Sequence, residues 1–572
     1  MTQDLRVLIA QRNATVGDLL GNLAIARDVL ARHAADTDLI VFPEAFLVGY
    51  QADDLVLQPG FLRDARASLD ALAESVRAAA GPAVLVGTIL DGGTKPHNAA
   101  VLLYPDGTRR VATKVDLPDN GPFDERRTFA PGALREPFPL AGVRVGVAIC
   151  EEAWHGPVIA RLAAESADLV VVLNASPYTR DKHADQRLPL MRRRIRETGL
   201  PLVYVNLVGG QDELVYDGAS FALAADGAVV TTLPAFAEAE AALSFERRTG
   251  RITAAARPGS EYPDRDAADY AASQLALRDY VEKNRFPGIV YGNSGGLDSA
   301  FTGALAVDAL GRDRVLAVTM PSHITTGASL GDALHVADGL GIRQLEFGIG
   351  DLTAGIIDRV APEFGGRLAP LTRENIQPRL RMTLLMAVSN EAGLLTLATS
   401  NKSEASVGYT TIYGDMAGGF NPIKDLWKTE VARLATLRNG SELAERLGLD
   451  LGERVPPGVI AKPPSAELSE GQTDEAALGP YDLLDPALRL LVEEQADVAE
   501  TARILQRTHA PQLRQNGRAD DLRYLGPDHL ARIARLVRRA EHKRRQAPIG
   551  PKLSARAFGR DRRFPITNHY DR

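Results

Sequence analysis

A glycine-rich segment near the middle of the chain has the residue types and spacing of an anion-binding turn. It reads GNSGGLDS over residues 292–299 and follows a short apolar run, Gly288–Tyr291. Apolar residues at helical spacing come next, so the pattern predicts a strand, a tight turn and a helix N-terminus, where free backbone N–H groups attract phosphate. The Gly-Lys-Ser/Thr ending of the Walker loop is missing, so the usual nucleotide-hydrolase interpretation fails. Taken alone, the segment could also be an ordinary glycine turn.

Three further segments carry residues that could cleave an amide. Cys150, the only cysteine, ends the strand-like run VRVGVAIC, which is a suitable position for a nucleophile. A thiol needs a lowered pKa or a neighbouring base to attack a carbonyl at neutral pH. Glu44 and Lys114 also follow strand-like runs, and they would supply a base and a cation. A buried, inert thiol is the alternative for Cys150 on its own.

With these three segments in this order, residues 5–248 resemble the nitrilase, or carbon–nitrogen hydrolase, superfamily. The resemblance implies an αββα sandwich with a Glu-Lys-Cys triad. It makes Glu44 the general base, Lys114 the cation that stabilises the developing oxyanion, and Cys150 the nucleophile. Glu125, in FDERRTF, matches the family's second glutamate, which orients the lysine. Such an amidase would release ammonia through a thioester, and the same general base would then activate water.

The segment NASPYTRDKHADQR, residues 174–187, resembles the one with which nitrilase-type glutaminases hold glutamine. Ser176 and Lys182 are the matches for that role. Asn120 stands where the family often has a tyrosine, so we expect a glutamine contact there that differs or is made by backbone. A solvated surface lysine is the alternative for Lys182.

The turn at 292–299 resembles the pyrophosphate loop of the N-type ATP pyrophosphatases, which cleave ATP between the α- and β-phosphates to adenylate a substrate. The segments that follow resemble one family among these, the glutamine-dependent NAD synthetases, in the family's usual order. Those segments are Val318–Ala333, Glu374–Asn390, Leu397–Val431, Lys462–Asp485 and Glu541–Lys552. With the nitrilase-like part included, the resemblance covers nearly the whole chain.

This second resemblance implies the residues that bind ATP. The phosphates would be bound by Gly292, Asn293, Ser294, Gly295, Gly296, Leu297, Asp298 and Ser299. Thr399 would also contact ATP. Asn293 departs mildly from the family, which usually has a small or apolar residue there, and Ser400 stands where related synthetases often have glycine.

The resemblance also implies contacts with deamido-NAD from Asn375, Glu404 and Lys543. Asp298 and Glu404 are the candidates to hold Mg2+, which prefers hard oxygen ligands. Taken singly, Asn375 could instead be a helix N-cap and Glu404 a solvent-facing helix residue.

The elements that must position these residues form two α/β patterns, of strand-like runs alternating with helical stretches. In the first pattern the predicted strands are 6–10, 39–42, 83–88, 99–104, 143–149, 169–173 and 202–206. Its predicted helices include 19–33, 62–80 and 157–166, and its predicted hairpin turns are 105–107 and 225–227. In the second pattern the predicted strands are 288–291, 315–319, 344–347 and 394–398. We expect an α/β fold: first a sheet covered by helices, with antiparallel edges, which the resemblance makes an αββα sandwich, and then a doubly wound parallel sheet whose ligands gather at the strands' carboxyl ends.

A chain of 572 residues is too long for one ordinary core, so two or three domains are expected. Residues 251–269 are rich in proline, glycine and charge and are predicted to be a linker. The predicted domains are therefore a nitrilase-like glutaminase domain over 1–250 and an NAD synthetase domain over 270–572.

Composition narrows the class of protein further. A net charge of −7 argues against a general nucleic-acid binder, and one cysteine excludes an internal disulfide framework. No segment reads as a signal peptide or a membrane span, so a cytoplasmic protein without a membrane partner is expected. Twelve lysines and arginines against two acids in 532–563 could suggest nucleic acid. Aromatic residues for stacking are scarce there, and pyrophosphate groups are a nearer partner for the charge.

The hypothesis is an AMP-forming ligase that amidates deamido-NAD to NAD with ammonia from glutamine, using ATP and Mg2+. It would act on small-molecule substrates and, as is common in the family, form a homo-oligomer. One alternative is another ATP-pyrophosphatase amidotransferase, making a nucleobase or asparagine, although those usually carry a different glutaminase domain. The other is a non-catalytic nucleotide-binding regulator that has kept the fold.

Overall fold

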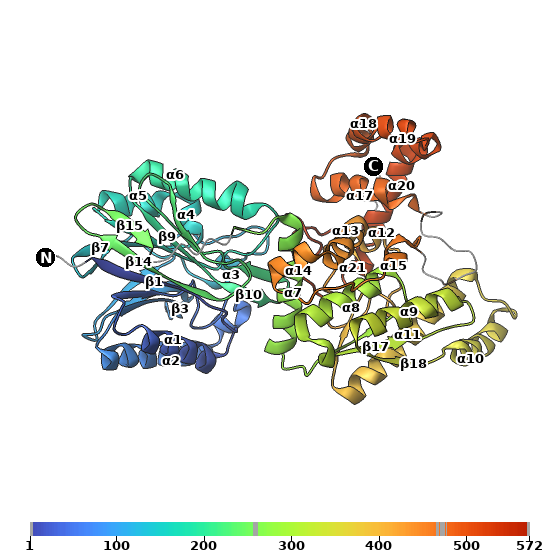
Figure 1. Cartoon of the computed structure of the whole chain (residues 1–572), viewed down its shortest axis with the longest axis horizontal. Coiled ribbons are helices and arrows are strands. Elements are labelled where there is room, and N and C mark those ends of the chain that lie inside the picture. Colours follow the sequence, from blue (N-terminus) through green and yellow to red (C-terminus); the bar gives the residue numbers. More distant parts are fainter. Residues whose placement is uncertain (1–3, 255–260, 465–467, 469–474, 476–477, 569–572) are drawn as a thin grey trace. The chain divides into compact units, whose positions relative to one another are not determined.

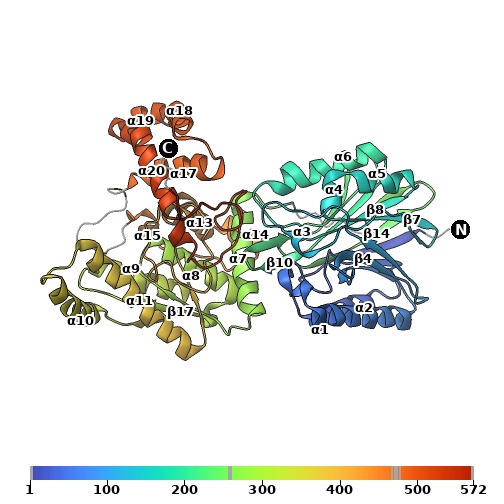
Figure 2. The same cartoon turned by 180° about the vertical axis from the view of Figure 1, so that it is seen from behind.

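The computed structural model describes residues 4–254, 261–464, 468, 475 and 478–568 of the chain. The chain separates into two compact units, Met1–Arg265 and Asp266–Arg572. Each unit has its own sheets and its own buried core, and their elements can be followed from opposite sides in Figures 1 and 2.

The first unit is built on two large sheets. Its strands are β1 (Leu5–Gln11), β2 (Leu39–Val41), β3 (Ala83–Leu90), β4 (His97–Leu103), β5 (Arg109–Thr113), β6 (Phe138–Leu140), β7 (Val143–Ile149), β8 (Leu169–Asn174), β9 (Leu202–Asn206), β10 (Val208–Gln211), β11 (Leu214–Asp217), β12 (Phe221–Leu223), β13 (Val229–Thr232), β14 (Ala239–Glu246) and β15 (Arg251–Ala254). The seven-stranded sheet has the order β15-β14-β1-β2-β3-β4-β5, and the six-stranded sheet has the order β13-β12-β9-β8-β7-β6. The strands β10 and β11 form a separate hairpin.

Helices cover the outer faces of these two sheets. The helical elements of this unit are α1 (Leu19–Arg32), η1 (Asp53–Leu57), α2 (Pro59–Ala79), α3 (Glu125–Thr128), α4 (Glu151–His155), α5 (Pro157–Ala164), η2 (His183–Arg187) and α6 (Leu188–Thr198). The helices α1 and α2 pack on the seven-stranded sheet, and α4, α5 and α6 pack on the six-stranded sheet (Figure 1). Between the sheets, side chains such as Ile9 and Val147 form an apolar layer. This is the αββα sandwich that the sequence predicts.

The second unit contains a four-stranded sheet and many helices. Its strands are β16 (Ile289–Gly292), β17 (Val315–Thr319), β18 (Arg343–Glu346) and β19 (Leu395–Leu397). Its helices up to the last strand are α7 (Arg265–Lys283), α8 (Leu297–Leu310), η3 (Arg312–Arg314), α9 (Gly327–Leu340), α10 (Gly350–Val360), η4 (Ala361–Phe364) and α11 (Pro370–Ala392). The later ones are α12 (Lys402–Val407), α13 (Lys428–Asn439), α14 (Ser441–Leu447), α15 (Pro457–Ala461), α17 (Tyr481–Leu488), η5 (Arg489–Glu493), α18 (Val498–Thr508), α19 (Ala510–Gln515), η6 (Ala519–Leu525), α20 (Pro527–Arg539) and α21 (Glu541–Arg544).

All pairings in this sheet are parallel, in the order β18-β17-β16-β19. Val290 shares a buried cluster with Leu385 of α11 on one face of the sheet. The next residue, Tyr291, points to the other face, where Gly303 of α8 leaves room for its ring. Successive strand residues face opposite sides of a sheet, so α11 covers one face and α8 covers the other. The sheet is therefore doubly wound and parallel, as predicted.

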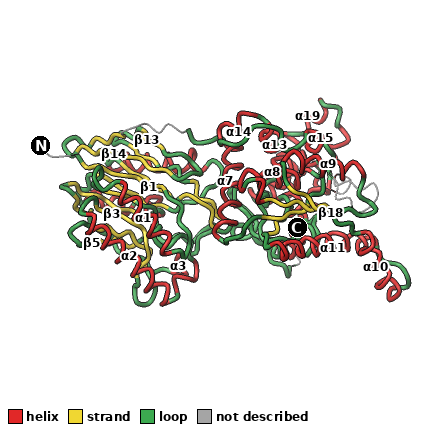
Figure 3. The backbone as a smooth tube through the Cα atoms, turned by 60° about the horizontal axis from the view of Figure 1, so that its bottom comes forward, coloured by secondary structure: helices red, strands yellow, loops and turns green. Residues whose placement is uncertain are grey.

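Most predicted elements are present with small shifts at their ends. The strands 143–149, 202–206 and 315–319 match β7, β9 and β17 at both ends. The two predicted hairpin turns connect antiparallel pairs, β4 with β5 and β12 with β13. Figure 3 shows β5 and β13 among the yellow strands of the first unit.

The predicted linker is longer than the irregular segment that the structure describes. Its first four residues form β15, which pairs with β14, and its last five belong to α7. Ile252 is buried, because its side chain packs into the layer between the two sheets. Composition missed this strand, since one buried residue between polar neighbours gives little signal. Residues 255–260 lie outside the described residues, so the domain limits stay a prediction.

Candidate functional site

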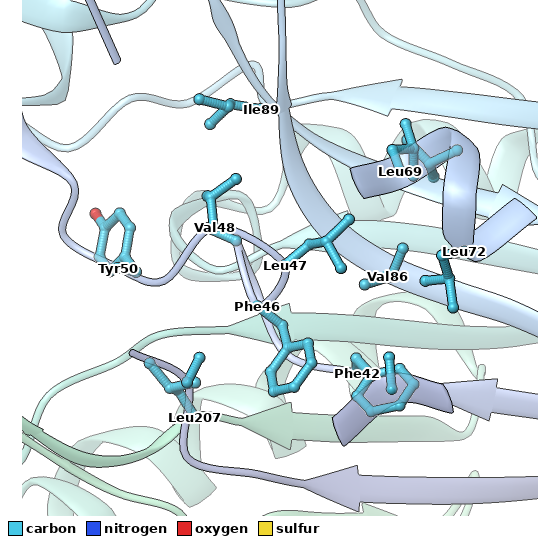
Figure 4. Packing of buried hydrophobic residues seen from close by; sticks show 14 of the residues in the cluster. Phe42, Phe46, Leu47, Val48, Tyr50, Leu69, Leu72, Val86, Ile89 and Leu207 are labelled. Atoms are coloured by element: carbon cyan, nitrogen blue, oxygen red, sulfur yellow. The ribbon is translucent and has the colours of Figure 1, made fainter. Parts of the chain in front are cut away.

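The turn that carries Glu44 is fixed by apolar packing. Phe42 and Phe46 flank it, with ring centroids 4.8 Å apart, and both are fully buried beside α2 and β3 (Figure 4). Gly87 leaves space for the turn, since a Cβ there would lie 2.2 Å from the backbone nitrogen of Ala45. The packing therefore holds the Glu44 backbone in one place.

Buried polar side chains meet around Lys114. Its Nζ lies 2.7 Å from Oε1 of Glu44 and 2.9 Å from Oε2 of Glu125. Asn98 donates to the same Glu44 oxygen at 2.8 Å, and the Tyr50 hydroxyl donates to Glu125 at 2.7 Å. The structure thus brings together three residues that the sequence predicted. Asn98 and Tyr50 were missed, because neither belongs to the quoted motifs.

Burial and charge act against each other in this network. Burial alone would lower the pKa of Lys114, but the charges of Glu125 and Glu44 outweigh it and raise that pKa well above the usual value. Burial raises the pKa of Glu125, and Lys114 opposes this effect. Oε2 of Glu44 accepts from the backbone N–H of Ala175 at 2.9 Å. The lysine therefore stays charged between two held carboxyl groups.

Cys150 occupies the sharp turn between β7 and α4. Its φ is 42°, a left-handed value that few non-glycine residues adopt and that often marks functional sites. Burial raises the pKa of its thiol well above the usual value, the charge of Glu44 adds to this, and Lys114 opposes it. The resting thiol is therefore neutral, so attack on a carbonyl requires a base. Glu44, whose charge acts on the thiol, is the candidate.

The predicted glutamine segment follows β8. Ser176 is buried, and its backbone N–H donates to Oδ1 of Asn206 at 2.9 Å. Lys182 donates to the Pro177 carbonyl at 3.0 Å, and its Nζ lies 5.4 Å from the Trp154 ring centroid. This side chain is half-buried rather than a solvated surface lysine.

Asn120 lies on an exposed turn. Its carbonyl oxygen accepts a hydrogen bond from the backbone N–H of Phe123 at 3.0 Å. A contact between Asn120 and glutamine stays a prediction.

A buried cluster behind Ser176 was not predicted from the sequence. The Arg187 guanidinium donates to both oxygens of Asp217 at 3.0 Å and to the Ser176 carbonyl at 3.3 Å. The Tyr262 hydroxyl donates to Asp217 at 2.8 Å, and its ring stacks on His183 with centroids 4.3 Å apart. These residues come from four separate segments, so no local pattern indicates the cluster.

In the second unit, the glycine-rich turn joins β16 to α8 and forms its own hydrogen bonds. The hydroxyls of Ser294 and Ser299 lie 3.1 Å apart, and the backbone N–H of Gly296 donates to the Ser294 hydroxyl at 3.2 Å. Gly295 has a φ of 75°, and a Cβ there would lie 2.2 Å from the Ser329 carbonyl oxygen. The turn therefore requires glycine at this position.

The side chain of Asn293 supports this turn from behind. Its amide donates to the Ala333 carbonyl and to Oε1 of Gln344, both at 2.8 Å. These bonds connect the turn to α9 and β18. A contact between Asn293 and ATP would therefore come from its backbone.

A cavity of about 670 Å³ lies beside the turn, a size that suits a nucleotide. The predicted residues that line it are Gly292, Asn293, Ser294, Gly296, Leu297, Asp298, Ser299, Thr399 and Glu404. Other polar residues that line it are Arg381, Asp415, Lys428 and Lys462. Gly295, Asn375 and Lys543 are not among the lining residues.

Lys428 joins the two predicted metal ligands. Its Nζ forms an ion pair with Asp298 and lies 3.6 Å from Oε1 of Glu404. Asn401 donates to the other Asp298 oxygen at 3.2 Å. The two carboxylates thus face one cation, and the Glu404 side chain is 14% exposed rather than solvent-facing. The sequence contained Lys428 in the motif DLWKTEV, but a lysine at a helix start is too common to indicate a site.

Two of the predicted deamido-NAD residues meet at the loop after α12. Asn375 accepts from the Thr411 hydroxyl at 3.0 Å. Lys543 donates to the carbonyls of Gly408 and Thr410, both at 2.7 Å. Asn375 lies inside α11, so it is not an N-cap.

The fold and the two sites define two classes of protein in one chain. A family model described as carbon-nitrogen hydrolase matches residues 6–251, the part with the αββα sandwich, the ion pairs of Lys114 with Glu44 and Glu125, and Cys150. A family model described as NAD synthase matches residues 270–547, the part with the parallel sheet and the glycine-rich, phosphate-type turn at residues 292–299.

Relatives extend this likeness over the full length. A glutamine-dependent NAD(+) synthetase of Rhodobacter capsulatus is 42% identical, covering 100% of this chain and 99% of the relative. One from Xanthomonas campestris is 39% identical, covering 99% and 98%. A solved glutamine-dependent NAD+ synthetase of Acinetobacter baumannii, in complex with ADP, has a TM-score of 0.74 at 34% identity, covering 99% of each chain. The chain belongs to the family of glutamine-dependent NAD(+) synthetases.

Proposed function

We propose that the chain makes NAD from deamido-NAD, ATP and glutamine, releasing AMP, pyrophosphate and glutamate. One observation carries this proposal: a buried Glu44–Lys114 pair whose charges act on the buried Cys150 thiol, and a phosphate-type turn beside a large cavity, occur in one chain. Both belong to a chain that matches family members over its full length.

The first unit would cleave glutamine. The thiol of Cys150 attacks the carboxamide carbon while Glu44 takes the thiol proton. Glu44 then passes this proton to the amide nitrogen, the C–N bond breaks, and ammonia leaves to give a thioester. The new oxyanion faces Lys114, which has three N–H donors and uses two of them on Glu44 and Glu125. Water, activated by Glu44, then hydrolyses the thioester to glutamate.

Substrate contacts in this unit would come from the segment after β8. Ser176 and Lys182 hold the glutamine, with Asn120 as a third predicted contact. Lys182 supports this role because its charge acts on the Cys150 thiol.

The second unit would activate the acceptor. Backbone N–H groups of the turn and the hydroxyls of Ser294 and Ser299 hold the phosphates of ATP, and Thr399 contacts the nucleotide. The nicotinate carboxylate of deamido-NAD attacks the α-phosphate, and pyrophosphate leaves. Ammonia then attacks the adenylated carbonyl carbon, and AMP leaves. A carboxylate accepts ammonia only after it carries such a leaving group.

Deamido-NAD would be bound by Asn375, Glu404 and Lys543. Asn375 and Lys543 already contact the same loop, residues 408–411. Lys428, which the sequence did not indicate, would face the phosphates with its ammonium group.

Asp298 and Glu404 would hold Mg2+ together with phosphate oxygens. In the structure these two carboxylates both face the Lys428 ammonium, so they lie close together. Such a pair suits Mg2+, which usually binds one or two carboxylates plus substrate phosphates. Among the described residues, no three His, Cys, Asp or Glu side chains gather into a metal site. When bound, Mg2+ would neutralise charge on the leaving pyrophosphate.

The test of this function is the variant Cys150→Ala. With deamido-NAD and ATP present, NAD formation from glutamine should vanish, while formation from added ammonium should continue. Amide-labelled glutamine and mass analysis of the NAD identify the nitrogen source. Unchanged glutamine use by the variant would refute the assigned nucleophile. Pyrophosphate release only with a xanthosine nucleotide or aspartate would favour the other amidotransferase.

We also infer a homo-oligomer that acts in the cytoplasm without nucleic acid. Exposed apolar side chains on neighbouring elements of the second unit, Leu352, Phe364 and Leu371, support contact with a second copy. Among the described residues, no helix has both the length and the apolar composition needed to cross a bilayer.

A further inference from the structure

A carboxylate next to the nucleophile contacts both catalytic segments of the first unit. Glu152 comes two residues after Cys150, and its side chain has no exposed surface. It accepts from the backbone N–H of Val115 at 2.6 Å and from that of Ile149 at 2.7 Å. Val115 follows Lys114, and Ile149 precedes Cys150. One side chain therefore joins the backbones that carry the catalytic lysine and the catalytic cysteine.

Arg135 holds this carboxylate in place. Its guanidinium pairs with both Glu152 oxygens, at 3.0 Å for Nη1 to Oε1, and its side chain is 8% exposed. It also donates to the Thr113 carbonyl at 2.8 Å and to the Val147 carbonyl at 3.0 Å. Thr113 ends β5 in the seven-stranded sheet, and Val147 belongs to β7 in the six-stranded sheet. The ion pair therefore ties the two sheets together.

We propose that Glu152, held by Arg135, is a positioning residue that sets Lys114 against Cys150. Hydrogen bonds between strands fix positions within each sheet, but they leave the distance between two stacked sheets free. The apolar layer between the sheets is not directional. A charge-assisted, bidentate pair with two backbone N–H groups is directional. It can therefore keep the lysine at the place where the oxyanion forms.

This inference rests on the proposed glutaminase chemistry, and the variant Glu152→Gln tests it. The amide has the same size but cannot accept from both N–H groups and from Arg135 together. A misplacement of a catalytic group by about 1 Å can lower the reaction rate about 100-fold. We therefore expect kcat for glutamine hydrolysis to fall roughly 10- to 100-fold. KM for glutamine should stay within about threefold, and ammonium-driven NAD formation should match the wild type.

The matched control is Asp38→Asn in the same unit. Asp38 likewise accepts from a backbone N–H and a guanidinium, both of Arg6, at 2.8 Å. It joins β1 to the start of β2 and touches neither catalytic segment. Its variant should keep the wild-type kcat.

A second measurement follows the thiol directly. Cys150 is the only cysteine, so the rate of alkylation by iodoacetamide reports this residue alone. A displaced Lys114 stabilises the thiolate less, and the pH profile of alkylation should shift to higher pH in Glu152→Gln but not in Asp38→Asn. A merely structural role would not move this profile.

Arg135→Lys keeps the test open if Glu152→Gln does not fold. Lysine keeps a charge beside Glu152 but lacks the fork that reaches Thr113 and Val147, so a smaller loss of kcat at unchanged KM is expected. Wild-type kcat in both variants would overturn the inference, as would an equal loss in Asp38→Asn. Glutamine hydrolysis that survives Cys150→Ala would instead overturn the proposed function itself.

Discussion

Burial decides how the charged residues of the glutaminase centre behave. Lys114, Glu44 and Glu125 form one ammonium between two carboxyl groups with almost no exposed side-chain surface. In water such groups interact weakly, but in a buried site each depends on its partners. The charges proposed to stabilise an oxyanion should therefore also affect the stability of the unit.

Lys114→Met should destabilise the first unit strongly. The change leaves Glu44 and Glu125 buried without a cation, which typically costs about 3–5 kcal/mol. Urea unfolding can be followed by the fluorescence of Trp154 in a Trp427→Phe background, because these are the two tryptophans and Trp154 alone lies in this unit. Adding Glu125→Gln should recover part of the loss. A free energy of unfolding within about 1 kcal/mol of the wild type would contradict this account.

His183 should make the first unit less stable in acid. Burial and then the charge of Arg187 lower its pKa from 6.5 to about 4 in the folded unit. Between these pH values the unfolded chain binds a proton that the folded unit does not. Stability should therefore fall as pH falls from 6.5 to 4, with a slope of about 1.4 kcal/mol per pH unit.

His183→Gln should remove that part of the slope. The comparison is the free energy of unfolding of both proteins at several pH values between 4 and 7. Parallel curves for the variant and the wild type would show that His183 does not titrate in this way.

At the scale of elements, the candidate residues cluster on turns that follow strands. Glu44 follows β2, Lys114 follows β5, and Cys150 follows β7, while the phosphate-type turn follows β16. A strand end places a side chain firmly, and the turn leaves it free to face a ligand. Left-handed backbone at Cys150 and at Gly295 sharpens two of these turns.

Gly295→Ala should weaken ATP binding without disturbing the first unit. A Cβ there would lie 2.2 Å from the Ser329 carbonyl oxygen, and the φ of 75° would be strained. Both glutamine-driven and ammonium-driven NAD formation should fall at least tenfold, an effect of roughly 1.4 kcal/mol or more. Calorimetric titration with ATP checks the loss of binding.

The control is Gly331→Ala in α9, where a Cβ would meet nothing within 4 Å. A glycine inside a helix costs about 0.5–1 kcal/mol relative to alanine, so this variant should be slightly more stable and bind ATP normally. Equal loss of ATP binding in both variants would argue against the close approach at Gly295.

At the scale of the whole molecule, each unit carries its own candidate site. The carboxylate–lysine–cysteine centre lies inside the first unit, and the cavity with the phosphate-type turn lies inside the second. The second unit also exposes large apolar side chains near α10, which stands out from the body of its unit (Figure 3). Large exposed apolar patches mark protein–protein interaction sites, so these side chains are the candidates for a contact between copies.

The double variant Phe364→Ser with Leu371→Gln should shift the protein toward the monomer. These side chains are 69% and 66% exposed, so their loss should cost the folded monomer little. Sedimentation velocity measures the change in mass. Leu451→Gln is the control, because Leu451 is 62% exposed in the same unit but lies outside α10, η4 and α11. An unchanged oligomer in the double variant would reject this face.

Local patterns in the sequence determined many strands and turns of this protein and the residue types of its candidate sites. Apolar runs of four to seven residues predicted β7, β9 and β17, and the glycine-rich run predicted the turn between β16 and α8. Motif resemblance indicated Glu44, Lys114 and Glu125, which do meet in the fold. These signals are readable because each depends on neighbours within a few residues.

Only the tertiary structure decided which distant residues share a site. Lys428 reaches Asp298 across 130 residues, and Glu152 reaches Val115 across 37. The cluster of Arg187 and Asp217 behind Ser176 likewise depends on several segments. Such contacts follow from how sheets stack and helices cross, and these arrangements leave no periodic trace along the chain. For the same reason, the sequence indicated the kinds of chemistry, while the fold determined which charges face one another.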